Sequence, residues 1–195
     1  MAKTIRWCLL AVWMVFVPTH AAVLIIDGSG ILRGATGVQV GTQLYDVTFV
    51  EGTCAEALGA CDAAHFTFND QTTAQAAAEA LLSSVLVGQF DVNPGRIFGC
   101  TATFCDVQTP YLIQFIPLEA PAPTGVLVAL AHNCNEIDAW CPDSVDAAYG
   151  FNINVSTATS PSRVWAVWTS VPEPGTLALL VLGLAGIAAL RRRKH

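Results

Sequence analysis

The pattern of apolar and polar positions divides the chain into two apolar ends and a mixed middle. Eleven consecutive apolar residues run from Trp7 to Val17, and a second apolar run extends from Leu177 to Leu190. Between these runs, short alternating segments and one helical stretch occupy residues 22–170. The ends and the middle are therefore expected to be different kinds of segment.

The clearest helical periodicity of the middle part extends from Thr72 to Val87. Thr72 and Gln75 have the spacing of a capping box, and Gly88 is a favourable residue for the C-terminal cap. Apolar residues recur every three or four positions and predict one buried face, made of Ala74, Ala77, Ala78, Leu81, Leu82, Val85 and Leu86. We therefore expect a helix over residues 72–87 that packs on a sheet.

Five other segments have the composition of β-strands. Residues 45–49 and 151–155 alternate between apolar and polar side chains, while residues 111–116, 126–131 and 163–169 are rich in aliphatic and aromatic residues. Clusters of Pro, Gly, Ser and Asn separate these segments. Because strands and helices do not alternate along the chain, the pattern predicts an α+β fold: a mainly antiparallel sheet or sandwich with one main helix.

Charge separates the same three parts of the chain. Residues 22–170 contain three arginines, no lysine and fourteen carboxylates, a net charge of −11, whereas both ends are basic. A body this acidic repels a phosphate backbone, which argues against nucleic acid as a partner. The chain as a whole is 53% hydrophobic and 12% charged, which is more apolar than a typical soluble domain.

The N-terminal end has the parts of a secretory signal peptide. Two basic residues precede the apolar run, and the small residues Thr19 and Ala21 occupy positions −3 and −1 of a cleavage site after Ala21. Cleavage after Ala22 is the alternative. The run is too short to span the ~30 Å hydrocarbon core as a helix. We therefore expect the Sec translocon to export the chain and signal peptidase to remove residues 1–21.

The C-terminal end combines a rigid turn, an apolar helix and a basic stop. Pro172, Glu173 and Pro174 precede the fourteen-residue apolar run from Leu177 to Leu190. That run is shorter than the roughly 20 residues of an average span, but four cations that hold the end in the cytoplasm follow it directly. These cations are Arg191, Arg192, Arg193 and Lys194. The pattern predicts a membrane helix over residues 177–190.

This tail resembles the PEP-CTERM sorting signal of Gram-negative bacteria, also called the ice-binding-protein C-terminal domain. The resemblance covers residues 171–195 and implies recognition by an exosortase, a membrane transpeptidase that processes the chain near Pro-Glu-Pro. It also implies an exported surface or extracellular protein, associated with extracellular polysaccharide or biofilm, whose precursor is anchored in the cytoplasmic membrane. Residues 41–54 and the alanine-rich helix are similar to the bodies of other PEP-CTERM proteins, which implies a shared fold and no activity.

Six cysteines remain in the body, where an oxidising compartment favours disulfides. Six cysteines permit 15 connectivities, but they form three local couples, which favours bonds within each couple. The couples are Cys54 with Cys61, Cys100 with Cys105, and Cys134 with Cys141. The alternative is a zinc site that includes His65 or His132, although zinc fingers use more closely spaced cysteines. We therefore expect disulfides, no metal and no other cofactor.

Motifs for catalysis are weak in the body. Ser29 lies in a turn-like Asp-Gly-Ser-Gly segment rather than in a Gly-x-Ser-x-Gly motif, and His65 and His132 have no partner motif. No pair of carboxylates has a context that marks a glycosidase. The carboxylates around the last cysteine couple lack EF-hand spacing, so we expect a hydrophilic loop rather than a Ca²⁺ site. They are Glu136, Asp138, Asp143 and Asp146.

The sequence therefore favours a non-enzymatic surface or matrix protein with a structural or interaction role. A glycan-binding module of the exopolysaccharide matrix is the alternative, and its sugar-stacking faces would be Trp140, Trp165, Trp168 and Tyr149. A secreted hydrolase is the third hypothesis. Exposed coplanar aromatic rings would favour the second hypothesis, and two carboxyl groups about 5–9 Å apart in a cleft would favour the third.

Overall fold

The computed structural model describes residues 21–115, 124–135 and 140–172. Residues 1–20 of the predicted signal peptide, the predicted membrane helix over residues 177–190 and the predicted basic stop lie outside the described residues. Of the Pro-Glu-Pro element, Pro172 is described, whereas Glu173 and Pro174 are not. Among the described residues, no helix combines the length and the apolar character needed to cross a membrane.

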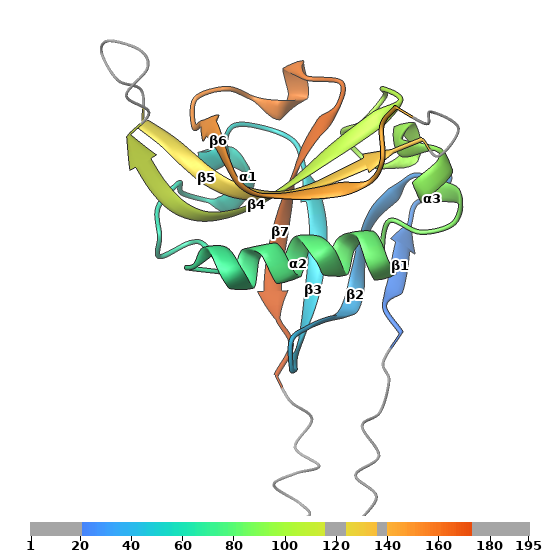
Figure 1. The fold of residues 1–195 in the computed structure, drawn as a ribbon, viewed down its shortest axis with the longest axis horizontal. Coiled ribbons are helices and arrows are strands. Elements are labelled where there is room, and N and C mark those ends of the chain that lie inside the picture. The colour runs from blue at the N-terminus through green and yellow to red at the C-terminus, as the bar shows by residue number, and fades with distance from the viewer. Residues whose placement is uncertain (1–20, 116–123, 136–139, 173–195) are drawn as a thin grey trace, which may run out of the picture.

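Seven strands form one mixed but mostly antiparallel sheet in the order β1-β2-β3-β7-β4-β5-β6. The strands are β1 (Val23–Ile26), β2 (Leu32–Val40), β3 (Gln43–Val50), β4 (Phe104–Phe115), β5 (Thr124–Cys134), β6 (Ser144–Asn152) and β7 (Arg163–Ser170). Among the described strands, β4 and β7 are the parallel neighbours. Strand β7, the last described strand in sequence, lies in the middle of the sheet. Figure 1 shows that the sheet is strongly bent, with the helix α2 (Gln71–Ser84) lying across it. The predicted α+β fold with a mainly antiparallel sheet is confirmed.

The bounds of α2 correct the predicted helix at both ends. The N-cap is Asp70, whose Oδ1 accepts a hydrogen bond from the Thr73 backbone N–H at 2.9 Å, so the predicted capping box of Thr72 and Gln75 is wrong. The Gln75 side chain instead donates to Glu79. Helix α2 ends at Ser84, before the predicted end at residue 87. Gly88, at φ +60°, instead precedes the short helix α3 (Gln89–Val92).

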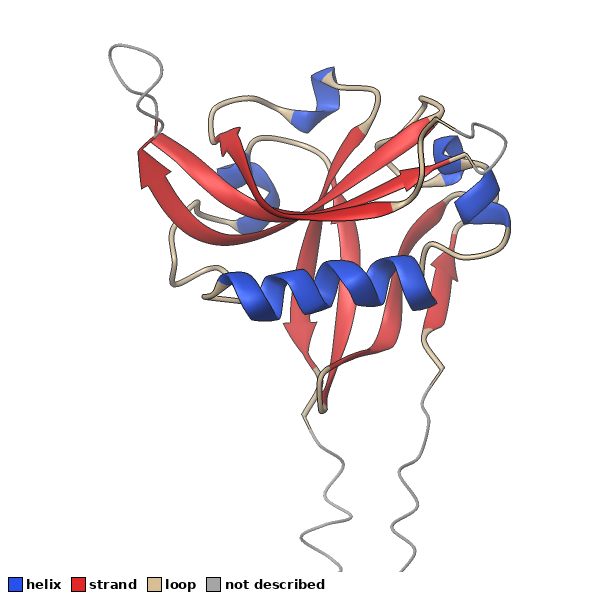
Figure 2. Cartoon of the chain, in the orientation of Figure 1, coloured by secondary structure: helices blue, strands red, loops and turns tan. Residues whose placement is uncertain are grey.

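Two apolar clusters lie on opposite faces of the sheet. Helix α2 covers the larger one, in contact with β2, β4, β5 and β6. The smaller one lies beside the short helix α1 (Cys54–Leu58) and contains Cys54, Phe66, Val126, Val128, Leu130, Phe151 and Trp165. Strand β7 contributes to both, because Trp165 and Trp168 are three positions apart and point to opposite faces. Figure 2 shows the helices against the sheet.

Four of the expected strands are present within β3, β4, β5 and β7, although β4 begins seven residues before the predicted start at residue 111, whereas the predicted strand at residues 151–155 is largely wrong. Strand β6 ends at Asn152, whose side-chain oxygen accepts from the Asn154 backbone N–H and starts a turn. Strand β2 was not expected, because glycines weaken its strand pattern. Gly34 is required there, since a Cβ at this position would lie 2.1 Å from the Val47 carbonyl oxygen.

Both described ends of the body lie at the same end of the sheet, where β1 begins and β7 ends. Strands β1, β2, β3 and β7 are successively antiparallel, so the start of β1 and the end of β7 point the same way. Figure 1 shows the chain entering β1 and leaving β7 at the same end of the sheet, with β2 and β3 between them. The Val171 backbone N–H donates to the Leu44 carbonyl at 2.9 Å and holds the exit against β3. The predicted boundaries of the body, residues 22 and 170, lie at this end of the sheet.

Candidate functional site

A row of polar side chains crosses four adjacent strands at the end of the sheet opposite the chain termini. In the strand register, Asp106 of β4 pairs with Arg163 of β7 on one side and with His132 of β5 on the other. His132 in turn pairs with Ser144, the first residue of β6. Sheet register therefore brings together residues that are far apart in the sequence.

The carboxylate of Asp106 is buried between two basic side chains. Its Oδ1 lies 2.5 Å from His132 Nδ1, and its Oδ2 lies 3.7 Å from Arg163 Nε. The Arg163 guanidinium also donates to the Tyr149 hydroxyl at 3.3 Å. Because Asp106 accepts at Nδ1, a neutral His132 carries its proton on Nδ1 and presents the lone pair of Nε2 on its other side.

The Nε2 atom of His132 faces the disulfide between Cys134 and Cys141. It lies 3.0 Å from Cys134 Sγ and 3.2 Å from Cys141 Sγ. The three ligand atoms lie within 4.8 Å of one another, as in a metal site, but the two sulfurs are bonded to each other. Since metals bind thiolates, this oxidised pair supplies none. The site is a disulfide flanked by an Asp–His pair.

Carboxylates beside this disulfide bind backbone groups. Asp143 accepts from the Cys134 backbone N–H at 2.8 Å, and Asp146 accepts from the Ala148 backbone N–H at 3.1 Å. Burial raises the pKa of Asp143 above its ordinary value, although the hydrogen bond from Cys134 acts against this shift. The other two carboxylates suggested for a Ca²⁺ site, Glu136 and Asp138, lie outside the described residues.

The structure contains the three disulfides that were predicted because their cysteines lie close together in the sequence. Cys100 and Cys105 are both buried in the larger cluster, and Cys54 is the first residue of α1. A capping box of Thr53 and Glu56 starts α1, and the Thr-x-x-Glu pattern is the sequence signal for this short helix, which the apolar periodicity does not reveal. His65, the other candidate zinc ligand, bonds Asp62 at 2.8 Å.

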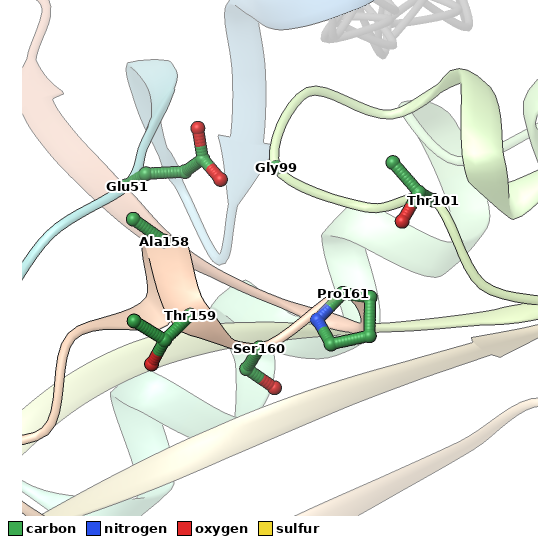
Figure 3. A pocket seen from close by; sticks show the side chains of 7 residues that line it. All are labelled: Glu51, Gly99, Thr101, Ala158, Thr159, Ser160 and Pro161. Atoms are coloured by element: carbon green, nitrogen blue, oxygen red, sulfur yellow. The ribbon is translucent and has the colours of Figure 1, made fainter.

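A shallow pocket of about 310 Å³ lies on another part of the surface. Figure 3 shows that the Glu51 carboxylate and the hydroxyl groups of Thr101, Thr159 and Ser160 line it. This lining holds one carboxylate, whereas glycoside hydrolysis by the usual mechanisms needs two. The arrangement therefore gives no support to the hydrolase hypothesis.

The four aromatic residues considered for glycan binding do not form one exposed surface. Trp165 and Trp168 are 0% and 5% exposed, and their indole N–H groups donate to Gly52 O and Thr109 Oγ1. Tyr149 is half-buried, and only Trp140, at 94%, is fully exposed. Trp165 and Trp168 therefore supply no sugar-stacking faces to the alternative hypothesis, because the indoles fill opposite cores.

Ser29 occupies the turn that its sequence context predicts. The Asp27 carboxylate accepts from the backbone N–H groups of Ser29 and Ile31 and from the Arg33 side chain. The hydrogen bond from Ile31, followed by that from Arg33, lowers the pKa of Asp27. These contacts give Ser29 a structural setting in a turn.

Sequence comparison decides the nature of the C-terminal end. Residues 170–194 match the family model of the PEP-CTERM protein-sorting motif. The chain carries a PEP-CTERM sorting motif. A motif of this kind marks an exported, cell-surface protein that exosortase processes, and here it begins at Ser170, the last residue of β7. Comparisons with curated proteins and with solved structures give no match.

Proposed function

We propose that this PEP-CTERM protein is a non-enzymatic surface or matrix protein whose body is held at one end of its sheet during sorting. The junction of the motif with the sheet carries the proposal, because the motif starts at Ser170, where β7 ends. Strand β7 lies between β3 and β4, so the tail joins the centre of the sheet rather than a loose edge.

The same geometry gives the body an orientation. The start of β1 lies at the end of the sheet where β7 ends, so the leader and the tail are both attached to that end of the sheet. The row of Arg163, Asp106 and His132 lies at the other end of β7, roughly 23 Å away at the usual rise of a strand. During sorting, this row faces away from the cytoplasmic membrane. Three disulfides support a role outside the cell, where reducing thiols are scarce.

Substitution of the sorting element tests the assignment in the full chain. We expect the P172A/E173A/P174A variant, expressed in a host that contains exosortase, to accumulate as a membrane-bound precursor. The wild-type chain should reach the surface or the extracellular fraction. The chain offers a matched control, P117A/E119A/P121A, which removes the same residue types from the body and should be sorted normally. Normal sorting of the first variant would contradict the proposal.

A second measurement tests the non-enzymatic role. The exported protein is incubated with the host's extracellular polysaccharide, whose size distribution is followed by size-exclusion chromatography. We expect the polysaccharide to keep its size distribution and part of the protein to elute with it. Shortening of the polysaccharide would contradict the non-enzymatic role while leaving the sorting result intact.

A further inference from the structure

We propose that the Cys134–Cys141 disulfide is a thiol-exchange site, through which the body forms a mixed disulfide with an external thiol. The other two disulfides are structural. This inference rests on the surroundings of the sulfur atoms and does not depend on the proposed function.

The two sulfurs of this disulfide differ in access. Cys134 is 1% exposed at the end of β5, whereas Cys141 is half-buried in the following segment. An external thiolate can therefore approach Cys141 Sγ, in line with the bond to Cys134. This asymmetry makes Cys141 the sulfur that is attacked and Cys134 the leaving group.

His132 lies where the leaving sulfur of the exchange needs a proton donor. Its Nε2 is 3.2 Å from the attacked sulfur and 3.0 Å from the leaving sulfur. Asp106 accepts from Nδ1 at 2.5 Å, so a protonated ring is paired with a carboxylate on one side and directs its Nε2–H at the disulfide on the other. This imidazolium stabilises the Cys134 thiolate that forms and gives it a proton.

The exchange balances without a further reagent. His132 takes up the proton that the incoming thiol releases to the solvent, and the sulfur of the resulting thiolate forms a bond to Cys141 Sγ. The Sγ–Sγ bond breaks, and its electron pair leaves on Cys134, which then takes the proton from His132. If the reagent is a dithiol, its second sulfur attacks the mixed disulfide and releases the Cys141 thiol. The dithiol is oxidised by two electrons and the protein disulfide is reduced by two.

The Cys54–Cys61 disulfide is a matched internal control. Both pairs have a separation of seven positions, and in both the first cysteine is buried and the second half-buried. Among the described residues, however, no histidine nitrogen lies within hydrogen-bonding distance of Cys54 or Cys61 sulfur. The nearest histidine in sequence, His65, is bonded to Asp62 through Nδ1.

Timed reduction of the exported protein tests the proposal. The protein receives a limiting pulse of dithiothreitol, is quenched with an alkylating reagent, and is analysed by peptide mass spectrometry. We expect Cys134 and Cys141 to be labelled about tenfold faster than Cys54 and Cys61, a conservative value for one general acid. A monothiol should give an adduct on Cys141 rather than on Cys134.

Variants separate the chemical role of His132 from a structural one. His132→Asn retains a donor toward Asp106 but has no acidic group that can protonate Cys134, so we expect labelling of Cys134 and Cys141 to slow about tenfold while the rate at Cys54–Cys61 stays unchanged. His65→Asn should change neither rate. If His132→Asn accelerates both disulfides, it unfolds the body, and Asp106→Asn, which leaves the His132 ring in place, then serves as the second variant and should slow only Cys134–Cys141.

Three outcomes would overturn the proposal. The first is equal rates for the two seven-residue disulfides in the wild-type protein. The second is an unchanged Cys134–Cys141 rate in folded variants of both His132 and Asp106. The third is free Cys134 and Cys141 thiols with an equimolar amount of zinc in the protein as exported, which would replace the disulfide with a metal site.

Discussion

The Cys54–Cys61 and Cys134–Cys141 disulfides have the same cysteine spacing but different surroundings. Both disulfides close a separation of seven positions, with Cα–Cα distances of 5.4 and 5.7 Å. Cys54 packs in an apolar cluster with Phe66 and Trp165, whereas Cys134 faces an imidazole. The comparison teaches that spacing along the chain determines which cysteines pair, while the neighbouring strands determine what the pair can do.

The surroundings differ because the two regions lie on different parts of the sheet. Cys54 starts α1 on the face of the smaller cluster, and its backbone N–H donates to the Ile153 carbonyl at 3.3 Å. Cys134 ends β5 beside the polar row formed by Arg163, Asp106 and His132. The first disulfide therefore belongs to the packing of the fold, and the second borders a site with its own chemistry.

The largest expected loss of stability comes from a substitution in the apolar cluster around Cys54. Trp165 is completely buried in the cluster below Cys54, and its Nε1 donates to the Gly52 carbonyl at 2.9 Å. We expect Trp165→Ala to lower the free energy of unfolding by about 3–5 kcal/mol, measured by urea denaturation. Trp140→Ala, beside the second disulfide, removes a side chain that is 94% exposed and should change it by less than about 0.5 kcal/mol. Similar losses of unfolding free energy in the two variants would contradict the conclusion that the first disulfide belongs to the packed core and the second to a surface site.

Removal of each disulfide should have the next largest effect. The loops have equal length, so C54A/C61A and C134A/C141A should each lose about 2–3 kcal/mol of loop-closure stabilisation. We expect C54A/C61A to lose about 1 kcal/mol more, because Cys54 Sγ fills space within an apolar cluster. Urea denaturation of both variants measures the difference, and a larger loss at C134A/C141A would reverse the comparison.

The sequence was sufficient for features that depend on local spacing. The couples of cysteines lie five or seven positions apart, and proximity along the chain selects their partners. The buried face of α2 follows from its periodicity, since Ala74, Ala77 and Leu81 are each 0% exposed. Caps were harder to predict, because Asp70 and Thr72 are both acceptable N-caps and only the path of the preceding chain decides between them.

The candidate site could not be predicted, because long-range register creates it. Asp106 meets His132 through the β4–β5 pairing and Arg163 through the parallel β4–β7 pairing. The second pairing requires β7 to insert between β3 and β4, which no local pattern encodes. The burial of Trp168 could not be decided from the sequence for a related reason: its residue type suits both a binding surface and a core, and only packing decides.

The smallest expected effect is a pH dependence of the cap that holds the first disulfide. The hydrogen bond from the Thr53 backbone N–H, followed by that from its side chain, lowers the pKa of Glu56 below its ordinary value of 4.5. A lowered pKa means that the folded state favours the carboxylate. Its stabilising effect is therefore present above pH 4.5 and is lost as the pH falls through the lowered pKa of the folded state.

We therefore expect Glu56→Gln to lower Tm by about 1–2 °C at pH 7 and to have a smaller effect at pH 3, which lies below the ordinary value of 4.5. Thermal unfolding at both values measures this difference. Because the cap starts α1 at Cys54, the variant should increase amide hydrogen exchange in α1 and leave exchange around Cys134 unchanged. A Tm difference of equal size at both pH values would show that the side chain acts through packing rather than through its charge. Altered exchange around Cys134 would instead show that the two disulfide regions are coupled.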